Sequence, residues 1–249
     1  MPGYQTKRER ITIAGAEDLI ICSLLDRLQF SDPLGEADRA GISSASWSIF
    51  GQLWPSGAHL AGRMASRVVR SSERVLEIGC GLAMASLVAH RRGADVTASD
   101  CHPLAATFLK ENLRLNDLSP MKYRHGRWSD PETPRARDGT SEPCMVRGQY
   151  DLIIGSDVLY ERDASAALAV FIVRHAKAAA EVWIVDPNRG NRPAFNRQMV
   201  AEGFLMREER LDSPASLGAA AYKGRFLMYR RVSTVGALDT PDPRGDRES

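Results

Sequence analysis

Two glycines and a carboxylate are the residues of this 249-residue chain best suited to hold a nucleotide-like ligand. Gly79 and Gly81 follow the apolar segment 74–78, and Asp100 ends a second apolar segment, twenty-one residues after Gly79. A strand, a glycine turn, a helix and a strand that ends in a carboxylate form the front of a nucleotide-binding βαβ unit. The carboxylate would accept hydrogen bonds from ribose hydroxyls, and the glycines would keep side chains away from the ligand.

Two neighbours of the glycine turn indicate which ligand the unit takes. A dinucleotide turn has glycine or alanine where Met84 stands, and the bulk of Met84 would crowd the helix against the strand. Glu77 places a carboxylate just before the turn, which suits a ligand with a cationic end. S-adenosylmethionine (SAM) carries a sulfonium and an ammonium group, so both residues favour SAM over NAD.

The segment from Val75 to Ala83 resembles the first motif of the seven-strand, class I SAM-dependent methyltransferases, (V/L)-L-(D/E)-(I/L/V)-G-x-G-x-G. It departs from that motif at the last glycine, where Ala83 stands. The resemblance implies an α/β fold with a Rossmann-like seven-stranded methyltransferase sheet and an antiparallel strand pair at its C-terminal end.

The hydrophobic pattern along the chain predicts the elements that would position these residues. The expected strands are 74–78, 95–99, 121–125, 150–155, 182–185, 204–211 and 225–231, and the expected helices 82–91, 103–116, 164–180 and 193–201. We divide the chain into an N-terminal extension (1–70) that contributes to the cofactor and acceptor site, a SAM-binding methyltransferase domain (71–232) and a disordered tail (233–249). Within the domain, the charged, Pro- and Gly-rich insert 130–148 is expected to be a surface loop.

A second polar cluster follows the expected strand 150–155, at the sheet edge where ligands gather in open α/β folds. Asp157 and Tyr160 form a D-x-x-Y motif there. With Leu53-Trp54-Pro55 and Arg127-Trp128-Ser129, this motif makes the chain resemble the protein-lysine methyltransferase family that modifies chaperones, elongation factors and the electron-transfer flavoprotein β-subunit. This segment lacks the (D/N)-P-P-(Y/F) motif, which is typical of enzymes that methylate exocyclic base nitrogens.

The resemblance implies a role for each matching residue. Trp54 would lie beside the methionine moiety of SAM, Asp100 at the ribose and Trp128 at the adenine. Asp157 and Tyr160 are the expected catalytic residues on the acceptor side. The full set of expected cofactor-binding residues is Trp54, Glu77, Gly79, Cys80, Gly81, Asp100, Trp128 and Ser156.

Structural alternatives remain open for several of these residues. Trp54 could anchor the extension to the sheet, Trp128 could cap the sheet, and Tyr160 could serve packing. Asp157 could be the N-cap of the following helix. The segment 186–189, after the fifth strand, faces the same sheet edge, and its aspartate could either cap the next segment or line an acceptor channel.

Composition narrows the functional class. A net charge of +2 and scattered arginines predict no nucleic-acid surface, and the four cysteines and five histidines lack metal-ligand spacing. No secretory signal and no membrane-spanning apolar run are visible, so we expect a cytoplasmic location, and we favour a monomer. The leading function is a SAM-dependent N-methyltransferase acting on lysines of a protein substrate. Two alternatives stay open: methylation of a small amine or heterocycle, and a non-catalytic module that binds SAM or another nucleotide.

Overall fold

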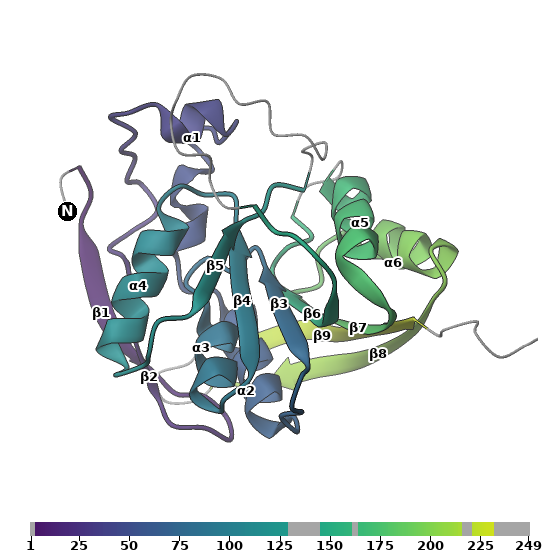
Figure 1. Ribbon diagram of the computed structural model, residues 1–249. Coiled ribbons are helices and arrows are strands. Elements are labelled where there is room, and N and C mark those ends of the chain that lie inside the picture. The colour runs from purple at the N-terminus through teal and green to yellow at the C-terminus, as the bar shows by residue number, and fades with distance from the viewer. Residues whose placement is uncertain (1–2, 129–144, 161–163, 216–220, 232–249) are drawn as a thin grey trace, which may run out of the picture.

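A seven-stranded sheet runs through the centre of the computed structural model, which describes residues 3–128, 145–160, 164–215 and 221–231 (Figure 1). The strand order is β5-β4-β3-β6-β7-β9-β8. β3 to β7 run parallel, whereas β9 is antiparallel to both β7 and β8. The strands are β3 (Arg74–Ile78), β4 (Asp95–Asp100), β5 (Lys122–His125), β6 (Tyr150–Ser156), β7 (Ala176–Asp186), β8 (Phe204–Ser213) and β9 (Tyr222–Arg231). The expected fold class is confirmed.

Helices cover both faces of the sheet and create two buried cores (Figure 1). The helices of the first core are α2 (Pro55–Ser66), α3 (Met84–Arg91) and α4 (Ala105–Leu115), and those of the second are α5 (Ala164–His175) and α6 (Arg192–Ala201). Strand β3 contributes Val75 to the first core and Leu76 and Ile78 to the second. Burial from both sides explains why its sequence is a continuous apolar run.

The N-terminal residues form a separate antiparallel pair, β1 (Thr6–Ile11) and β2 (Leu19–Leu24). The free edge of β2 is held by Asn112 of α4 and by Asn116, which caps the C-terminus of that helix. Asn112 accepts a hydrogen bond from the Cys22 N–H at 2.8 Å, and Asn116 accepts one from the Ile20 N–H at 2.9 Å. The short helices α1 (Glu36–Arg39) and η1 (Trp47–Gly51) then lead the chain toward α2.

The predicted boundary between the expected helix 164–180 and the expected strand 182–185 is wrong. The helix ends at His175, and β7 begins at Ala176 instead of near 182. The Ala-rich segment 176–180 has high helix propensity, but Ala176 pairs with Tyr150 of β6, and the register then shifts. Lys177 also forms an ion pair of 2.8 Å with Asp151, so pairing in the sheet overrides local propensity.

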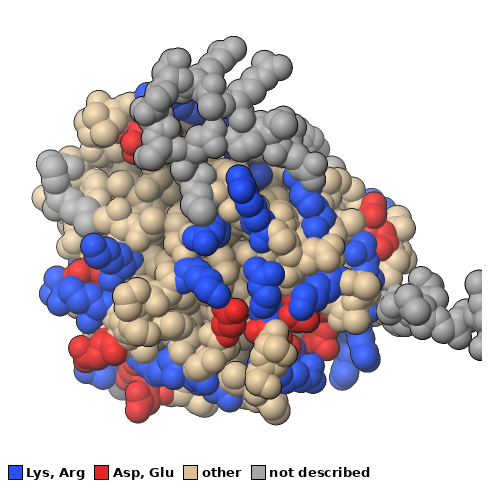
Figure 2. Space-filling model, in the orientation of Figure 1, with Lys and Arg blue, Asp and Glu red and all other residues tan. Residues whose placement is uncertain are grey.

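Several expectations concern residues outside the described ranges, namely the tail 233–249 and the insert 130–148 up to residue 144. Within the described ranges, no helix is long and apolar enough to cross a membrane, and no three His, Cys, Asp or Glu side chains gather as metal ligands would. Figure 2 shows one face of the molecule, on which Asp and Glu lie among the Lys and Arg side chains.

Candidate functional site

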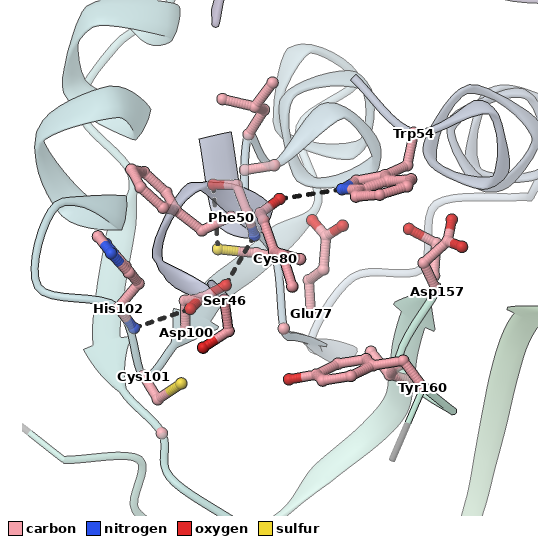
Figure 3. A pocket seen from close by; sticks show the side chains of 18 of the residues that line it. Ser46, Phe50, Trp54, Glu77, Cys80, Asp100, Cys101, His102, Asp157 and Tyr160 are labelled. Carbon is pink, nitrogen blue, oxygen red and sulfur yellow. Dashed lines mark hydrogen bonds between the residues drawn. The ribbon is translucent and has the colours of Figure 1, made fainter. Parts of the chain in front are cut away.

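A pocket of about 400 Å³ opens at the carboxyl ends of β3, β4 and β6. Its wall includes all ten residues that the sequence singled out, so the fold brings them together, although it leaves their individual roles open. Figure 3 shows Glu77 between two ends of this pocket. We call them the β4 end (Phe50, Asp100 and His102) and the β6 end (Trp54, Asp157 and Tyr160).

The turn after β3 requires glycines because a side chain there would collide with neighbouring protein atoms. The expected reason was a different one, namely room for the ligand. Gly79 has φ +54°, and a Cβ there would lie 2.9 Å from Val158. Gly81 has φ +49°, and its Cβ would lie 2.7 Å from the Phe50 carbonyl oxygen. Ala83 keeps the left-handed conformation of the missing glycine, with φ 60° and ψ 33°. The turn therefore packs η1 and the segment after β6 around the pocket.

Asp100 is buried at the β4 end and is fixed by backbone donors. One carboxylate oxygen accepts the Gly81 N–H at 2.8 Å, and the other accepts the His102 N–H at 2.9 Å. Burial raises the pKa of Asp100, and these hydrogen bonds counteract the rise. Each carboxylate oxygen has a second lone pair, so the group can still accept hydrogen bonds from ligand hydroxyls.

Glu77 is a buried carboxyl group with an unusual titration. One of its oxygens accepts the Ser86 N–H at 2.8 Å. Burial raises the pKa of Glu77 to about 7, and the nearby charge of Asp100 adds to the rise. A cationic ligand in the pocket would stabilise the ionised form of Glu77.

Two aromatic residues of the β4 end were not predicted from the sequence to belong to the site. The Phe50 and His102 rings stack with centroids 3.7 Å apart, and both line the pocket. Burial lowers the pKa of His102 to about 3, so its ring is neutral at pH 7. The position of His102, two residues after Asp100, was the available signal.

At the β6 end, Asp157 has a left-handed backbone with φ 58°. The helix-cap alternative fails, because the described residues 158–160, directly after Asp157, are not helical. Trp54 lines the pocket and donates its indole N–H to the Ile49 carbonyl at 3.0 Å, and it is only partly buried. The Trp128 and Tyr160 rings lie side by side, 6.4 Å between centroids.

Arg189 is the charged partner of Asp157, and no role had been assigned to it from the sequence. Its guanidinium lies 2.9 Å from Asp157 Oδ1 and also donates to the Asp157 carbonyl at 3.0 Å. Its backbone N–H donates to Asp186 Oδ2 at 2.9 Å. Asp186 is fully buried and is not among the residues that line this pocket. It holds the turn that carries Arg189.

Comparisons with known proteins agree with this geometry. The electron transfer flavoprotein beta subunit lysine methyltransferases of Danio rerio and Xenopus laevis are 30% and 28% identical over 146 and 147 residues, in each case 57% of this chain. The chain spans about half the length of these relatives, 50% and 52%. A methyltransferase structure from Pyrococcus furiosus matches 68% of this chain and 80% of its own, with TM-score 0.51 and 16% identity, which supports the fold. Residues 42–195, more than half of the 249 residues, match the family described as lysine methyltransferase, and the chain belongs to that family.

Proposed function

We propose that this protein transfers methyl groups from SAM to lysine side chains of a protein substrate. One observation carries the proposal: the same pocket holds two carboxylates at its opposite ends. Asp100, which is of the type that binds ribose, lies at the β4 end, and Asp157 lies at the β6 end. The family match supports lysine as the acceptor.

The residues of the pocket fit SAM as cofactor. Its volume of about 400 Å³ lies within the range of small-molecule sites. Asp100 would hold the ribose hydroxyls, and Trp128 would lie at the adenine. The buried Glu77 is a carboxylate without a cationic side chain bonded to it among the described residues. A ligand with a cationic end would compensate its charge. When bound, SAM supplies an activated methyl group on its sulfonium.

The β6 end would prepare the acceptor. A lysine must be neutral to attack the methyl group, and keeping it neutral at pH 7 costs about 4.6 kcal/mol in water because its pKa is near 10.4. Partial burial between Trp54 and Tyr160 would lower that cost. Asp157 would orient the amine or receive its proton, and Tyr160 would shape the channel.

The relatives' names suggest the first acceptor to test, the electron transfer flavoprotein β-subunit. Two buried cysteines of the described ranges, Cys22 and Cys80, are free thiols, which suits the reducing cytoplasm that we propose as the protein's location.

The test incubates the purified protein with methyl-labelled SAM, the β-subunit and a low-molecular-mass cell extract. Methyl-lysine in the β-subunit, located by mass spectrometry and absent when its lysines are acetylated beforehand, is the expected result. Label confined to small molecules would establish the small-amine alternative. SAM binding without transfer to any acceptor would establish the non-catalytic one.

A further inference from the structure

Arg189 holds Asp157 at two points. Its guanidinium contacts the carboxylate oxygen Oδ1 at 2.9 Å and the main-chain carbonyl at 3.0 Å. The Asp157 N–H also donates to the Val185 carbonyl at 3.0 Å. An aspartate with φ 58° is in a sparsely populated backbone region, and such a conformation persists only when the surroundings impose it. Arg189 supplies a large part of that restraint.

Arg189 is itself fixed in place. Asp186, with no exposed surface, accepts its backbone N–H at 2.9 Å. Its guanidinium also lies 5.8 Å from the centre of the Trp54 ring. The side chain thus connects the end of β7, the end of β6 and the aromatic wall of the pocket.

The second oxygen of Asp157 has no such partner. The side chain is 10% exposed, and Oδ2 makes no hydrogen bond to any described residue. The nearby Ser56 hydroxyl is hydrogen-bonded to the Tyr222 hydroxyl instead, at 2.9 Å. An unpaired buried acceptor is costly, so this oxygen is suited to receive an N–H group from a ligand in the pocket.

We propose that Arg189 is a positioning residue of the acceptor site, which clamps Asp157 so that Oδ2 receives an N–H of the acceptor lysine. This inference rests on the proposed lysine methylation. It assigns Arg189 a second effect, which is to offset the charge of Asp157. A carboxylate without this partner would stabilise the lysine ammonium and so oppose formation of the neutral amine.

Because of the charges around Asp157, removing Arg189 should change the pH dependence of methyl transfer. Burial raises the pKa of Asp157, while the nearby Ser56 hydroxyl and Arg189 hold it down. Asp186 faces the same groups with a second negative charge, and Tyr222, whose pKa burial raises to about 12, is neutral. Removing Arg189 leaves Asp157 without its cation, whereas Asp186 keeps Arg192 as a nearby positive charge. The pH at which Asp157 ionises must then rise, and the pH at which the lysine becomes neutral rises with it.

The test compares Arg189→Met, Arg189→Lys and the control Arg114→Met. Arg114 pairs with Glu111 at 2.8 Å on α4, and neither residue lines the pocket. Transfer from labelled SAM to the electron transfer flavoprotein β-subunit is measured against pH. Arg189→Met should slow transfer roughly tenfold or more at pH 7 and move the rising limb of the profile up by about one unit. Arg189→Lys should restore part of both changes. Glu77 also titrates near pH 7, but it is common to all variants.

The pKa of Asp157 is also measured directly, by a carboxyl-carbon NMR titration whose signal is assigned with Asp157→Asn. This measurement depends neither on methyl transfer nor on the substrate. Its midpoint should be higher in folded Arg189→Met than in wild type. An unchanged midpoint, or equal losses in Arg189→Met and Arg114→Met, would overturn the role of Arg189. A wild type that methylates no lysine would instead refute the proposed function, whatever the NMR midpoint.

Discussion

The two ends of the pocket hold their carboxylates in different ways. At the β4 end, Asp100 accepts hydrogen bonds from the backbone N–H groups of Gly81 and His102, close to it in the chain. At the β6 end, Asp157 is paired with the guanidinium of Arg189, which a different strand delivers. Backbone N–H groups hold a carboxylate in place without neutralising its charge, whereas the guanidinium of an arginine also offsets that charge. The difference suits a permanent binding site at one end and a proton-handling site at the other.

The largest effect should come from Asp157→Asn. Asparagine tolerates a left-handed backbone, so the fold and SAM affinity should be kept. The loss of the negative charge should slow methyl transfer by about 10²-fold or more. The matched control is Asp151→Asn at the start of the same strand, where Asp151 pairs with Lys177 at 2.8 Å. Equal transfer rates in the two variants would remove the distinction between the ends.

Asp100→Ala should act on binding. Hydrogen bonds to a charged group contribute about 1.5–3 kcal/mol, so cofactor affinity should fall roughly 10- to 150-fold. Calorimetry with SAM measures the loss, and thermal unfolding checks that the variant is folded. An unchanged affinity in a folded variant would show that Asp100 does not contact the cofactor.

The titration of Glu77 gives a further test of the pocket, through the pH dependence of cofactor binding. Its raised pKa, about 7, means that the folded apoprotein binds this proton more tightly than the unfolded chain does. Its contribution to stability is therefore lost as the pH rises through about 7. A cationic ligand should displace the proton, and roughly half a proton should be released at pH 7 on SAM binding.

Calorimetry in buffers of different ionisation enthalpy counts the released proton. Between pH 5.5 and 7, where the SAM amine stays charged, affinity should rise with pH by up to about tenfold per unit. Glu77→Gln should abolish both effects. Proton release that persists in Glu77→Gln would place the titrating group elsewhere.

The smallest effect is expected at Ala83. Ala83→Gly relieves about 1–2 kcal/mol of left-handed strain but adds about 0.4–1 kcal/mol of unfolded-state entropy and removes a buried methyl group contributing about 0.8 kcal/mol. The free energy of unfolding should change by less than about 1 kcal/mol. The control Ala85→Gly, fully buried inside α3, should lose about 2 kcal/mol. Similar losses in denaturant titrations of both would mean that Ala83 is not strained.

The same comparison explains what could be predicted from sequence. The β4 end follows from local order: an apolar strand, a glycine turn and Asp100 lie within one short segment, so spacing alone brings them together. Most elements follow from the hydrophobic pattern along the chain, and the fold class follows from the resemblance of the first motif. The pairing of Arg189 with Asp157 joins residues thirty-two positions apart, and spacing carries no signal for it. The start of β7 was missed for a similar reason, because alanines 178–180 favour a helix, whereas β6 pairs with Ala176 and Glu181 on either side of them.

The central claim is that one end of the pocket binds the cofactor and the other end handles the acceptor. Single-turnover methyl transfer at saturating labelled SAM tests it most directly in Asp100→Ala and Asp157→Asn. Saturation should return Asp100→Ala to nearly the wild-type rate, while Asp157→Asn should stay about 10²-fold slower. A rate that saturation restores in Asp157→Asn but not in Asp100→Ala would contradict the division of the pocket.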